Sequence, residues 1–412
     1  MNLLLKNAFI ATFLGNKAKK GKEMSEISLL KDYCVLTEGE YIKAVFPASR
    51  LGEYDVTGAQ VIDCGGKMVT AGYVDCHTHL VFAGDRAEEF NLRLKDVPYM
   101  EIMRRGGGII KTVEETRKAT LQELYQKALE NVKKSLCYGV TTLEAKSGYG
   151  LDIETELKQI AAADMLNGTQ PLDIVLTYMG AHATPKNMLS DEYVDFIIEQ
   201  ALPQIKAKSK AEFCDCFCEK NVFSLSQCER ILTKAKQLGF KLKIHAEEIE
   251  PLGGSGLAAK LDAVSCEHLL KISDENIRAL SDSKTVAVTL PITAFSLREA
   301  YAPARKMVDK GCALAAATDF NPGSCNCQSI PLLISLCVMY MGLTIEETLC
   351  AITLNAAAAI DRAGVIGTVE KGKFADLLIH NVFSLDELCY NFCANSVQSI
   401  IKKGKAAHAN HN

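Results

Sequence analysis

The sequence predicts an α/β fold, a (β/α)8 TIM-like barrel joined to a small β-sandwich domain that both ends of the chain build. Eight short apolar runs lie between about residues 67 and 366, and amphipathic helical patterns separate most of them. Strands that alternate with helical crossovers form parallel sheets, and eight such units close into a barrel. Outside this region, short strand-like runs are joined by polar turns. We therefore expect the barrel to cover residues 67–366 and the composite small domain to combine residues 1–66 with residues 367–412.

The eight runs have the composition of strands that are buried on both faces. Most are rich in Val, Ile, Leu and Ala and lack polar alternation, as parallel barrel strands do. In chain order they are Val69–Cys76, Thr141–Ala145, Ile174–Met179, Phe213–Phe217, Leu242–His245, Ala263–Cys266, Val286–Leu290 and Leu314–Thr318. The clearest helical patterns between them are Leu121–Tyr138, Ile153–Leu166, Ser226–Leu238 and Ser296–Lys310.

The two ends of the chain predict strands of the smaller domain. Leu3–Thr12 and Tyr33–Leu36 are strand-like, and no helical pattern appears before Gly65. The tail from about residue 367 contains a further apolar run, Leu377–Ile379. Chain ends are the least ordered part of most domains, so we expect His408–Asn412 to fray.

Length and composition restrict the class of protein. The chain has 412 residues, of which 48% are apolar and 23% charged, which excludes disordered, collagen-like and coiled-coil chains. The net charge of −4 gives no basic surplus for a nucleic-acid partner. The longest apolar stretch, Ile330–Leu343, is shorter than the about 20 residues of a membrane-spanning helix. Sixteen cysteines scattered through apolar segments, with no recognisable signal peptide, favour reduced thiols and a cytoplasmic location.

Polar residues gather at the predicted carboxyl ends of the strands, where a barrel of this type has its active site. The first run ends in the segment Asp75–His79, which contains two histidines. The later runs end in, or are followed by, Lys146, Ser147 and Tyr149; His182; Glu219; His245, Glu247 and Glu248; His268; and Asp319. Histidines scattered through a core would have no reason to share one face of a barrel, so this pattern predicts a functional site.

Four of these residues form a candidate metal site. His77 and His79 are two apart in an extended segment, so both imidazoles point to the same side and can reach one ion. His245 and Asp319 come from opposite sides of the barrel and complete a set of three imidazoles and one carboxylate. Such a set suits Zn or Fe, as one divalent or trivalent ion, and leaves a position for water. An isolated His-x-His pair is more often structural, and the matching strand ends of the other residues favour the metal.

Longer motifs resemble one family closely. Gly72–Leu80 is similar to the first-strand motif of the amidohydrolase superfamily, and Lys373–Leu377 to the return of its chain into a small β domain. More specific similarities, to the imidazolonepropionase family within it, are found in Phe82–Arg86, Tyr99–Met103 followed by Gly106–Gly108, Glu144–Gly150, Gly180–His182 and Asp319–Ser324. The resemblance extends over nearly the whole chain.

The resemblance implies a reaction and a set of roles. The reaction is hydrolysis of the cyclic amide C–N bond of 4-imidazolone-5-propanoate to N-formimidoyl-L-glutamate, a step of histidine degradation. One catalytic ion would be held by His77, His79, His245 and Asp319, and the assembly would be a homodimer. The family's substrate-binding positions correspond to Arg86, Tyr149, His182, Glu248, Asn321, Gly323 and Ser324. His268 matches a histidine that does not bind the ion.

The chemistry of these residue types suits such a substrate. The planar fork of Arg86 can bind the propionate through two N–H bonds. Tyr149 stands between two glycines that could let its loop approach a ligand closely, and His182 could bond the imidazolone oxygen. Asn321 and the turn after it, which includes Gly323, could present donors to a carboxylate or amide.

The general base remains open at this stage. Glu248, His268 and Asp319 are the three catalytic candidates, because each can hold a proton close to the expected ion. We interpret Glu247, the neighbour of the first candidate, as a solvated or helix-capping charge.

Three features lie outside this scheme. Ser324 stands where the family often has Thr, and Cys325 and Cys327 follow where a proline is usual, so we expect sensitivity to oxidation or to foreign metals. The alternating Cys214, Cys216 and Cys218 are interpreted as small buried residues and not as a second metal site. The run Gly106–Gly108 lacks the Lys of a phosphate-binding loop, and we interpret it as the hinge of a lid.

Two other functions compete with this interpretation. A purine or pyrimidine aminohydrolase would share the fold and the metal, but its substrate has no propionate and Arg86 would lose its purpose. A non-catalytic assembly protein with a barrel would be expected to have lost the ligands, yet all four are present.

Overall fold

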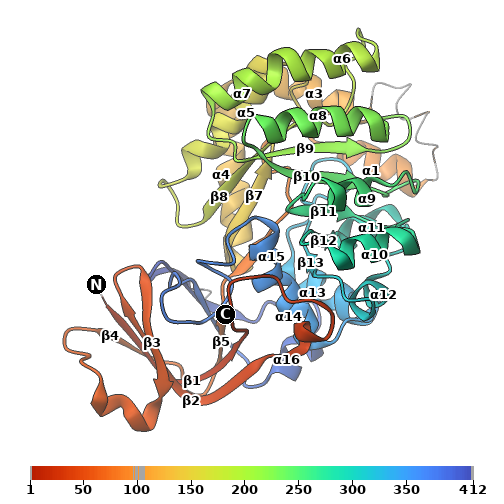
Figure 1. The fold of residues 1–412 in the computed structure, drawn as a ribbon. Coiled ribbons are helices and arrows are strands. Elements are labelled where there is room, and N and C mark those ends of the chain that lie inside the picture. Colours follow the sequence, from red (N-terminus) through yellow and green to blue (C-terminus); the bar gives the residue numbers. More distant parts are fainter. Residues whose placement is uncertain (1, 96, 98–100, 102–106, 410–412) are drawn as a thin grey trace.

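The computed structural model describes residues 2–95, 97, 101 and 107–409. It contains two sheets, and each sheet has eight strands. One sheet is a ring of parallel strands, and the other is a mixed sheet made of strands from both ends of the chain (Figure 1). The α/β barrel with a smaller β unit from the termini, as predicted from the sequence, is therefore confirmed.

The barrel strands follow one another around the ring in chain order. They are β6 (Tyr73–Asp75), β7 (Val140–Lys146), β8 (Asp173–Ala181), β9 (Phe213–Cys218), β10 (Lys241–Ala246), β11 (Ser265–His268), β12 (Val286–Thr289) and β13 (Leu314–Ala316). Every strand pairs in parallel with the next, and successive strands are linked by crossovers that contain helices. This connectivity brings all the carboxyl ends to one rim, where the sequence predicts the site.

Helices lie on the outside of the ring. Those between β6 and β9 are α1 (Ala87–Leu94), α3 (Ile109–Lys118), α4 (Leu121–Cys137), α5 (Ile153–Leu166), α6 (Ser190–Phe196) and α7 (Leu202–Lys208), with a short π-helical segment, Ile197–Ala201, joining the last two. Those that follow are α8 (Leu225–Gln237), α9 (Gly254–Lys260), α10 (Asp274–Asp282), α11 (Pro291–Leu297), α12 (Ala304–Asp309), α13 (Ile330–Met339), α14 (Ile345–Ile352) and α15 (Leu354–Ala359).

The second sheet joins the two ends of the chain. Its strands are β1 (Leu3–Thr12), β2 (Ser28–Glu38), β3 (Tyr41–Pro47), β4 (Gln60–Asp63), β5 (Met68–Ala71), β14 (Leu377–His380), β15 (Val397–Lys402) and β16 (Lys405–Ala409). The two ends meet where β14 pairs antiparallel with β5, and α16 (Leu385–Tyr390) lies between β14 and β15. Short 3-10 helices, Gly21–Ser25 and Ala48–Glu53, occupy the loops. In Figure 1 the red and orange strands lie beside the barrel, and the blue tail returns to them.

The run Val69–Cys76 is not one barrel strand, as the sequence analysis expected. Its first half is β5 of the terminal sheet, and its second half is β6 of the barrel. At Gly72 the backbone passes so close to Thr141 that an added Cβ would lie 2.2 Å from its Oγ1. A side chain at this position would therefore clash, and the glycine lets the chain cross from one sheet to the other.

The predicted helix Ser296–Lys310 is also wrong, because the structure has two short helices there. The first, α11, ends at Leu297, and Arg298 after it adopts a left-handed backbone with φ of 59°. Pro303 then precedes α12. A proline has no N–H for a helical hydrogen bond and disfavours helical geometry in the residue before it, so an amphipathic pattern cannot continue through it.

The ring closes at its carboxyl rim, beyond the ends of its first and last strands. The His79 amide donates to the Phe320 carbonyl (2.8 Å), and the Asp319 amide donates to the His77 carbonyl (3.1 Å). Deeper in the barrel, the Asp75 carboxylate accepts bonds from the Thr318 amide (3.0 Å) and hydroxyl (2.6 Å). A side chain thus replaces strand pairing between β6 and β13, and closure itself brings two histidines beside an aspartate.

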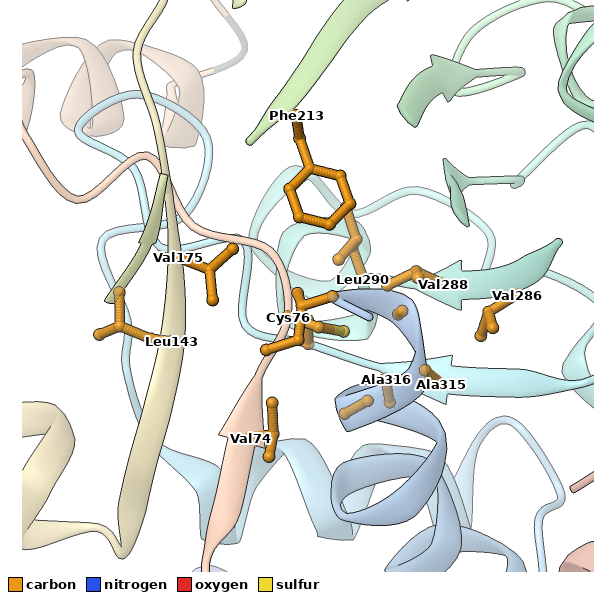
Figure 2. Close-up of a cluster of buried hydrophobic side chains, with 14 of the residues drawn as sticks. Val74, Cys76, Leu143, Val175, Phe213, Val286, Val288, Leu290, Ala315 and Ala316 are labelled. Carbon is orange, nitrogen blue, oxygen red and sulfur yellow. The ribbon is translucent and has the colours of Figure 1, made fainter. Parts of the chain in front are cut away.

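Apolar side chains fill the space inside the ring of strands and between the strands and their covering helices. Figure 2 shows one such cluster, with labelled side chains that include Val74 of β6, Leu143 of β7, Phe213 of β9 and Val288 of β12. Together they belong to one continuous core that extends through the barrel. Within the described residues, no helix has the length and apolar character needed to cross a membrane.

Candidate metal and substrate site

Three imidazoles and one carboxylate meet at the carboxyl rim. Nε2 of His77 lies 3.4 Å from Oδ1 of Asp319, and Nε2 of His79 lies 3.7 Å from the same oxygen. Nε2 of His245 lies 3.4 Å from Nε2 of His79. Two ligands bound at about 2.1 Å in tetrahedral geometry are separated by about 3.4 Å, so these spacings are those of atoms that share one ion. The structure thus brings together all four residues that the sequence selected as ligands.

Several ring nitrogens of this cluster are buried without ordinary partners. Both ring nitrogens of His77 and Nδ1 of His79 and of His245 form no hydrogen bond within the described chain. Burial, followed by neighbouring positive charges and imidazoles, holds the pKa of each of the three histidines well below its usual value of 6.5. The imidazoles are therefore neutral at physiological pH, which is the form that binds metal. Buried polar atoms left unpaired in this way fit a cation-binding role.

The three candidate bases surround the same point. Burial raises the pKa of Asp319 to about 7, and burial with the charges of Glu219 and Glu299 raises the pKa of Glu248 to about 7. Nδ1 of His268 lies 3.7 Å from Oε1 of Glu248. Ligand atoms of His268, His77 and Asp319 also lie within 4.8 Å of one another. All three candidates can therefore exchange a proton with a molecule held at the cluster.

The Asp319 carboxylate is oriented by a residue that the sequence analysis missed. The hydroxyl of Thr293, in α11, donates to Oδ2 of Asp319 at 2.7 Å, which leaves Oδ1 facing the histidines. Asp319 itself has a left-handed backbone with φ of 53°, an uncommon conformation for a residue with a side chain. Such strain persists where surrounding bonds enforce it, and it is typical of functional sites.

A network of buried charges lies one layer deeper in the barrel. Nζ of Lys146 lies 2.7 Å from Asp215, 3.0 Å from Glu144 and 3.6 Å from Glu267. Nζ of Lys243 lies 3.0 Å from Glu144 and 3.2 Å from Glu267. All five side chains are fully buried, and β7, β9, β10 and β11 contribute them. The contact between Lys146 and Glu267 spans strands that are not neighbours, so the network fills the interior of the ring.

The network touches the candidate ligands from behind. Oδ2 of Asp215 lies 3.0 Å from Nδ1 of His245, and Oε2 of Glu267 lies 3.7 Å from Nδ1 of His77, although neither pair forms a hydrogen bond. Carboxylates in this position hold an imidazole with its Nδ1 away from the ion and its Nε2 towards it. One signal in the sequence could have revealed this network, namely charged residues within strands that are predicted to be buried. Charged residues are almost never fully buried unless they are paired.

The loop that carries Tyr149 is tied to α5. The carboxylate of Glu156 accepts the backbone amides of Gly148 (3.0 Å) and Gly150 (2.8 Å), and Gln159 accepts the amide of Tyr149 (3.1 Å). A Cβ on Gly150 would lie 2.7 Å from the Glu156 backbone nitrogen. The two glycines therefore allow the loop to pack closely against the protein itself. The sequence analysis had attributed them to a close approach to a ligand.

His182 lies beside the cluster, and its contact with a backbone carbonyl indicates which ring nitrogen carries the proton. Its Nδ1 lies 3.1 Å from the carbonyl oxygen of Gly148, and because a carbonyl only accepts, Nδ1 carries the proton. Burial lowers the pKa of His182 to about 4, so the ring is neutral and its Nε2 is a hydrogen-bond acceptor. The ring stacks on His79 with centroids 4.9 Å apart. An N–H of a ligand, and not its oxygen, is the natural partner of this Nε2.

Asn321 organises the turn after Asp319. Its Nδ2 donates to the Asp319 carbonyl (2.7 Å) and to the Ser324 hydroxyl (2.9 Å), while its Oδ1 accepts the amides of Gly323 and Ser324, both at 2.8 Å. The donors that the sequence analysis assigned to a ligand are therefore engaged inside the turn. In this structure, Asn321 shapes the turn that presents Gly323 and Ser324.

Arg86 packs directly on this turn. A Cβ added to Gly323 would lie 2.0 Å from Nη1 of Arg86, so the guanidinium rests where a side chain would otherwise be. The charge of Arg86 also lowers the pKa of the nearby Tyr149 hydroxyl, although burial outweighs this effect and the net change is an increase. Arg86, Tyr149 and Gly323, far apart in the sequence, thus border one region at the mouth of the barrel.

Two glutamates after the strand ends hold the loop of Glu248. Glu219 accepts the backbone amides of Ile249 (2.9 Å) and Glu250 (3.1 Å). Glu247 is fully buried and accepts the hydroxyl of Ser255 at 2.6 Å, at the start of α9. Of the two alternatives expected for Glu247, the solvated charge is wrong because the side chain is buried, and the helix-capping charge is confirmed by its bonds at the start of α9.

The cysteine predictions have mixed outcomes. Cys214, Cys216 and Cys218 are each fully buried, and no candidate metal group within the described residues includes them. Burial raises the pKa of both Cys325 and Cys327, which disfavours the reactive thiolate and argues against the expected sensitivity to oxidation.

Most of one predicted motif and one residue of the predicted hinge lie outside the described residues. The motif Tyr99–Met103 lies outside the described residues except for Glu101, and Gly106 of the expected lid hinge lies outside them too. The lid therefore stays a prediction.

Comparisons with known proteins extend this picture. The pattern of the Amidohydrolase family matches residues 68–407. An imidazolonepropionase of Clostridium tetani is 47% identical over 411 residues, which covers 99% of this chain and 98% of that protein. One of Parabacteroides distasonis is 46% identical and covers 98% of both chains. Among solved structures, an adenosine deaminase from Xanthomonas campestris with bound zinc matches with a TM-score of 0.72 at 18% identity, over 98% of this chain and 92% of that one. This last likeness shows the fold alone.

Proposed function

The chain belongs to the amidohydrolase family, and from that premise we propose that it hydrolyses 4-imidazolone-5-propanoate to N-formimidoyl-L-glutamate. The observation that carries the proposal is the similarity, 47% identity over 99% of the chain, to a protein named imidazolonepropionase. In the reaction, the oxygen of water joins the ring carbonyl carbon, the cyclic amide C–N bond breaks, and the departing nitrogen gains a proton. The enzyme is thus a hydrolase of a cyclic amide.

We propose that His77, His79, His245 and Asp319 hold one metal ion, zinc or iron. Their neutral imidazoles, buried unpaired nitrogens and spacings of 3.4 to 3.7 Å support this assignment. When bound, such an ion supplies hydroxide at neutral pH by lowering the pKa of a water molecule towards about 7. The chain's own contribution is a rigid cluster, because the four side chains are buried and the backbones of His77, His79 and Asp319 are linked across the barrel closure.

The substrate's propionate is assigned to Arg86. A guanidinium binds a carboxylate through two parallel N–H bonds, and the position of this one beside Gly323 directs it towards the mouth of the barrel. His182, with an acceptor at Nε2, would receive a ring N–H of the imidazolone. Tyr149 would close the same side of the ring with its buried hydroxyl, and the turn of Asn321, Gly323 and Ser324 would form the opposite wall.

The proton transfers are assigned to groups that border the metal cluster. Glu248, with a pKa raised to about 7, is partly protonated near neutral pH and can both accept and return a proton. His268, 3.7 Å from Glu248, can relay a proton between that carboxylate and the departing ring nitrogen. We propose that Glu248 positions the attacking water or a ring nitrogen, and that Asp319 or His268 takes the water's proton.

The deciding experiment follows the absorbance of imidazolonepropionate in the presence of the protein. We expect the absorbance to fall, the activity to disappear after chelation, and either Zn or Fe to restore it. Release of ammonia from a purine or pyrimidine, with no loss of imidazolonepropionate, would establish the aminohydrolase instead. Freshly purified protein that contains no stoichiometric metal and turns over neither substrate would favour the assembly protein.

Cellular location and assembly complete the proposal. No cysteine forms a disulfide within the described part of the chain, which supports a reducing compartment such as the cytoplasm. We further propose a homodimer, for which the exposed rings of Tyr390 and Phe392, which line the same pocket, supply apolar surface. Sedimentation equilibrium tests the dimer, and a mass of one chain at micromolar concentration would contradict it.

A further inference from the structure

We infer that Glu89 is a positioning residue that orients the Arg86 guanidinium so that its Nη1–Nη2 edge receives the carboxylate of the substrate. The inference rests on the proposed function, since it specifies how that function recognises its substrate. Neither the motifs in the sequence nor the chemistry of the metal cluster assigns any role to Glu89.

The Glu89 carboxylate joins two elements. Its Oε2 accepts the Nε–H of Arg86 at 2.8 Å, and its Oε1 accepts the backbone amide of Gly108 at 2.9 Å. Glu89 lies in α1, and Gly108 is the residue before α3. The side chain of Glu89 is only 8% exposed, so water competes little for either bond. One buried carboxylate therefore holds the arginine and the start of α3 in a fixed relation.

Gly323 limits the guanidinium from the other side. Because Gly323 has no side chain, Nη1 can approach within 2.0 Å of the position that a Cβ would occupy. The carbonyl of Gly323 is held in turn by Nη2 of Arg93 at 3.2 Å. The guanidinium of Arg86 is thus confined between a carboxylate bound at Nε and a backbone turn packed against Nη1.

This arrangement selects one edge of the guanidinium. An arginine has five N–H donors in a planar fork, and a carboxylate can bind either at the Nη1–Nη2 edge or at an edge that includes Nε. Glu89 occupies Nε, and neither Nη1 nor Nη2 forms a hydrogen bond to a described residue. The Nη1–Nη2 edge therefore remains for an incoming carboxylate, and the bond from Glu89 has already removed the rotation that binding would otherwise have to stop.

The inferred role predicts a specific loss of carboxylate recognition. The experiment compares Glu89→Ala and Glu89→Gln with the wild type on two compounds, imidazolonepropionate and its neutral carboxamide analogue. We expect Glu89→Ala to reduce the preference for the carboxylate, measured as the ratio of the two kcat/KM values, by about 10- to 100-fold, the worth of a charge-assisted bond. Glu89→Gln keeps one acceptor oxygen, so its loss should be smaller.

A purely structural role would not produce this pattern, because damage to the fold lowers activity on both compounds equally. The matched control is Glu88→Gln on the same helix, since Glu88 is 91% exposed at its side chain and contacts Lys111 and not Arg86. We expect its preference and the metal content of all variants to equal those of the wild type. Glu89→Gln keeps the size of the side chain, so the question can be answered even if Glu89→Ala does not fold.

The outcomes separate the inference from the function on which it rests. An active wild type whose preference for the carboxylate survives in both Glu89 variants would overturn the inference and leave the function intact. A wild type that hydrolyses neither compound would overturn both. A lost preference with retained activity on the carboxamide would support both.

Discussion

Replacing Asp215 by Asn should weaken metal binding although Asp215 is not one of the proposed ligands. Its Oδ2 lies 3.0 Å from Nδ1 of His245 and 2.7 Å from Nζ of Lys146. The substitution keeps the shape of the side chain and removes its charge. His245 then loses the nearby negative charge that favours a proton on Nδ1 and leaves Nε2 for the ion, while Lys146 keeps Glu144 at 3.0 Å.

The expected effect follows from that contact. Removing a carboxylate behind a metal-bound imidazole typically lowers metal affinity by about 10- to 100-fold. This corresponds to about 1.4–2.8 kcal/mol of binding free energy. The distance of 3.0 Å places Asp215 in this range, whereas the 3.7 Å between Glu267 and His77 predicts a smaller effect for Glu267→Gln.

The assay is a competition titration between the protein and a chelator of known affinity. Glu144→Gln is the matched control, because Glu144 is likewise fully buried and pairs with Lys146, at 3.0 Å, but its carboxylate forms no ion pair with a ligand histidine in the described part of the chain. Both variants remove one charge from the same network, so a general loss of stability should appear in both. Equal metal affinity for the wild type and Asp215→Asn, or equal losses in the two variants, would refute the reasoning.

Three further perturbations have defined outcomes. Gly323→Ala places a Cβ 2.0 Å from Nη1 of Arg86, so the guanidinium must move. Steady-state kinetics should then show a KM for imidazolonepropionate that is raised by about 10- to 100-fold, with the metal retained. An unchanged KM would contradict the contact. His268→Ala should keep the metal and reduce kcat by about 10²- to 10⁴-fold, as loss of an acid–base group does, whereas metal loss would make His268 a ligand. Burial lowers the pKa of His380 to about 3. Below pH 6.5, His380 therefore takes up a proton when the protein unfolds, and the free energy of unfolding falls as the pH falls. In urea titrations, His380→Gln should reduce the fall in this free energy between about pH 7.5 and 5 by about 2 kcal/mol. An equal fall in the wild type and the variant would show that His380 is not responsible.

Much of the barrel was predictable because its signal is local. A strand buried on both faces must be apolar along its length, and each run from Thr141–Ala145 to Leu314–Thr318 overlaps a strand of the ring. The predictions failed where a local pattern meets a tertiary constraint. The run Val69–Cys76 is continuous in hydrophobicity, yet Gly72 divides it between two sheets, and only the approach of Thr141 reveals this.

The candidate ligands were also predictable, since parallel topology places all carboxyl strand ends on one rim. The residues behind them were not, because Asp215 and Glu267 lie within buried strands and belong to none of the motifs. Their partners come from other strands, so their role depends on distances across the ring. The role of Glu89 was equally unpredictable, because its position in the sequence indicates only that it lies in a helix. It does not indicate that Glu89 bonds to Arg86 and Gly108.

The order of residues along the chain was sufficient to predict the fold class, the family and the candidate metal-binding side chains, because burial and strand-end chemistry leave periodic and local marks. Folding alone decided which atoms face one another: that the Nε2 atoms turn towards Asp319, that Asn321 satisfies its own turn, and that Glu89 leaves one edge of Arg86 available. The physical reason is that a hydrogen bond or a ligand position depends on separations of a few tenths of an ångström between segments up to hundreds of residues apart, and no pattern along a chain records such separations.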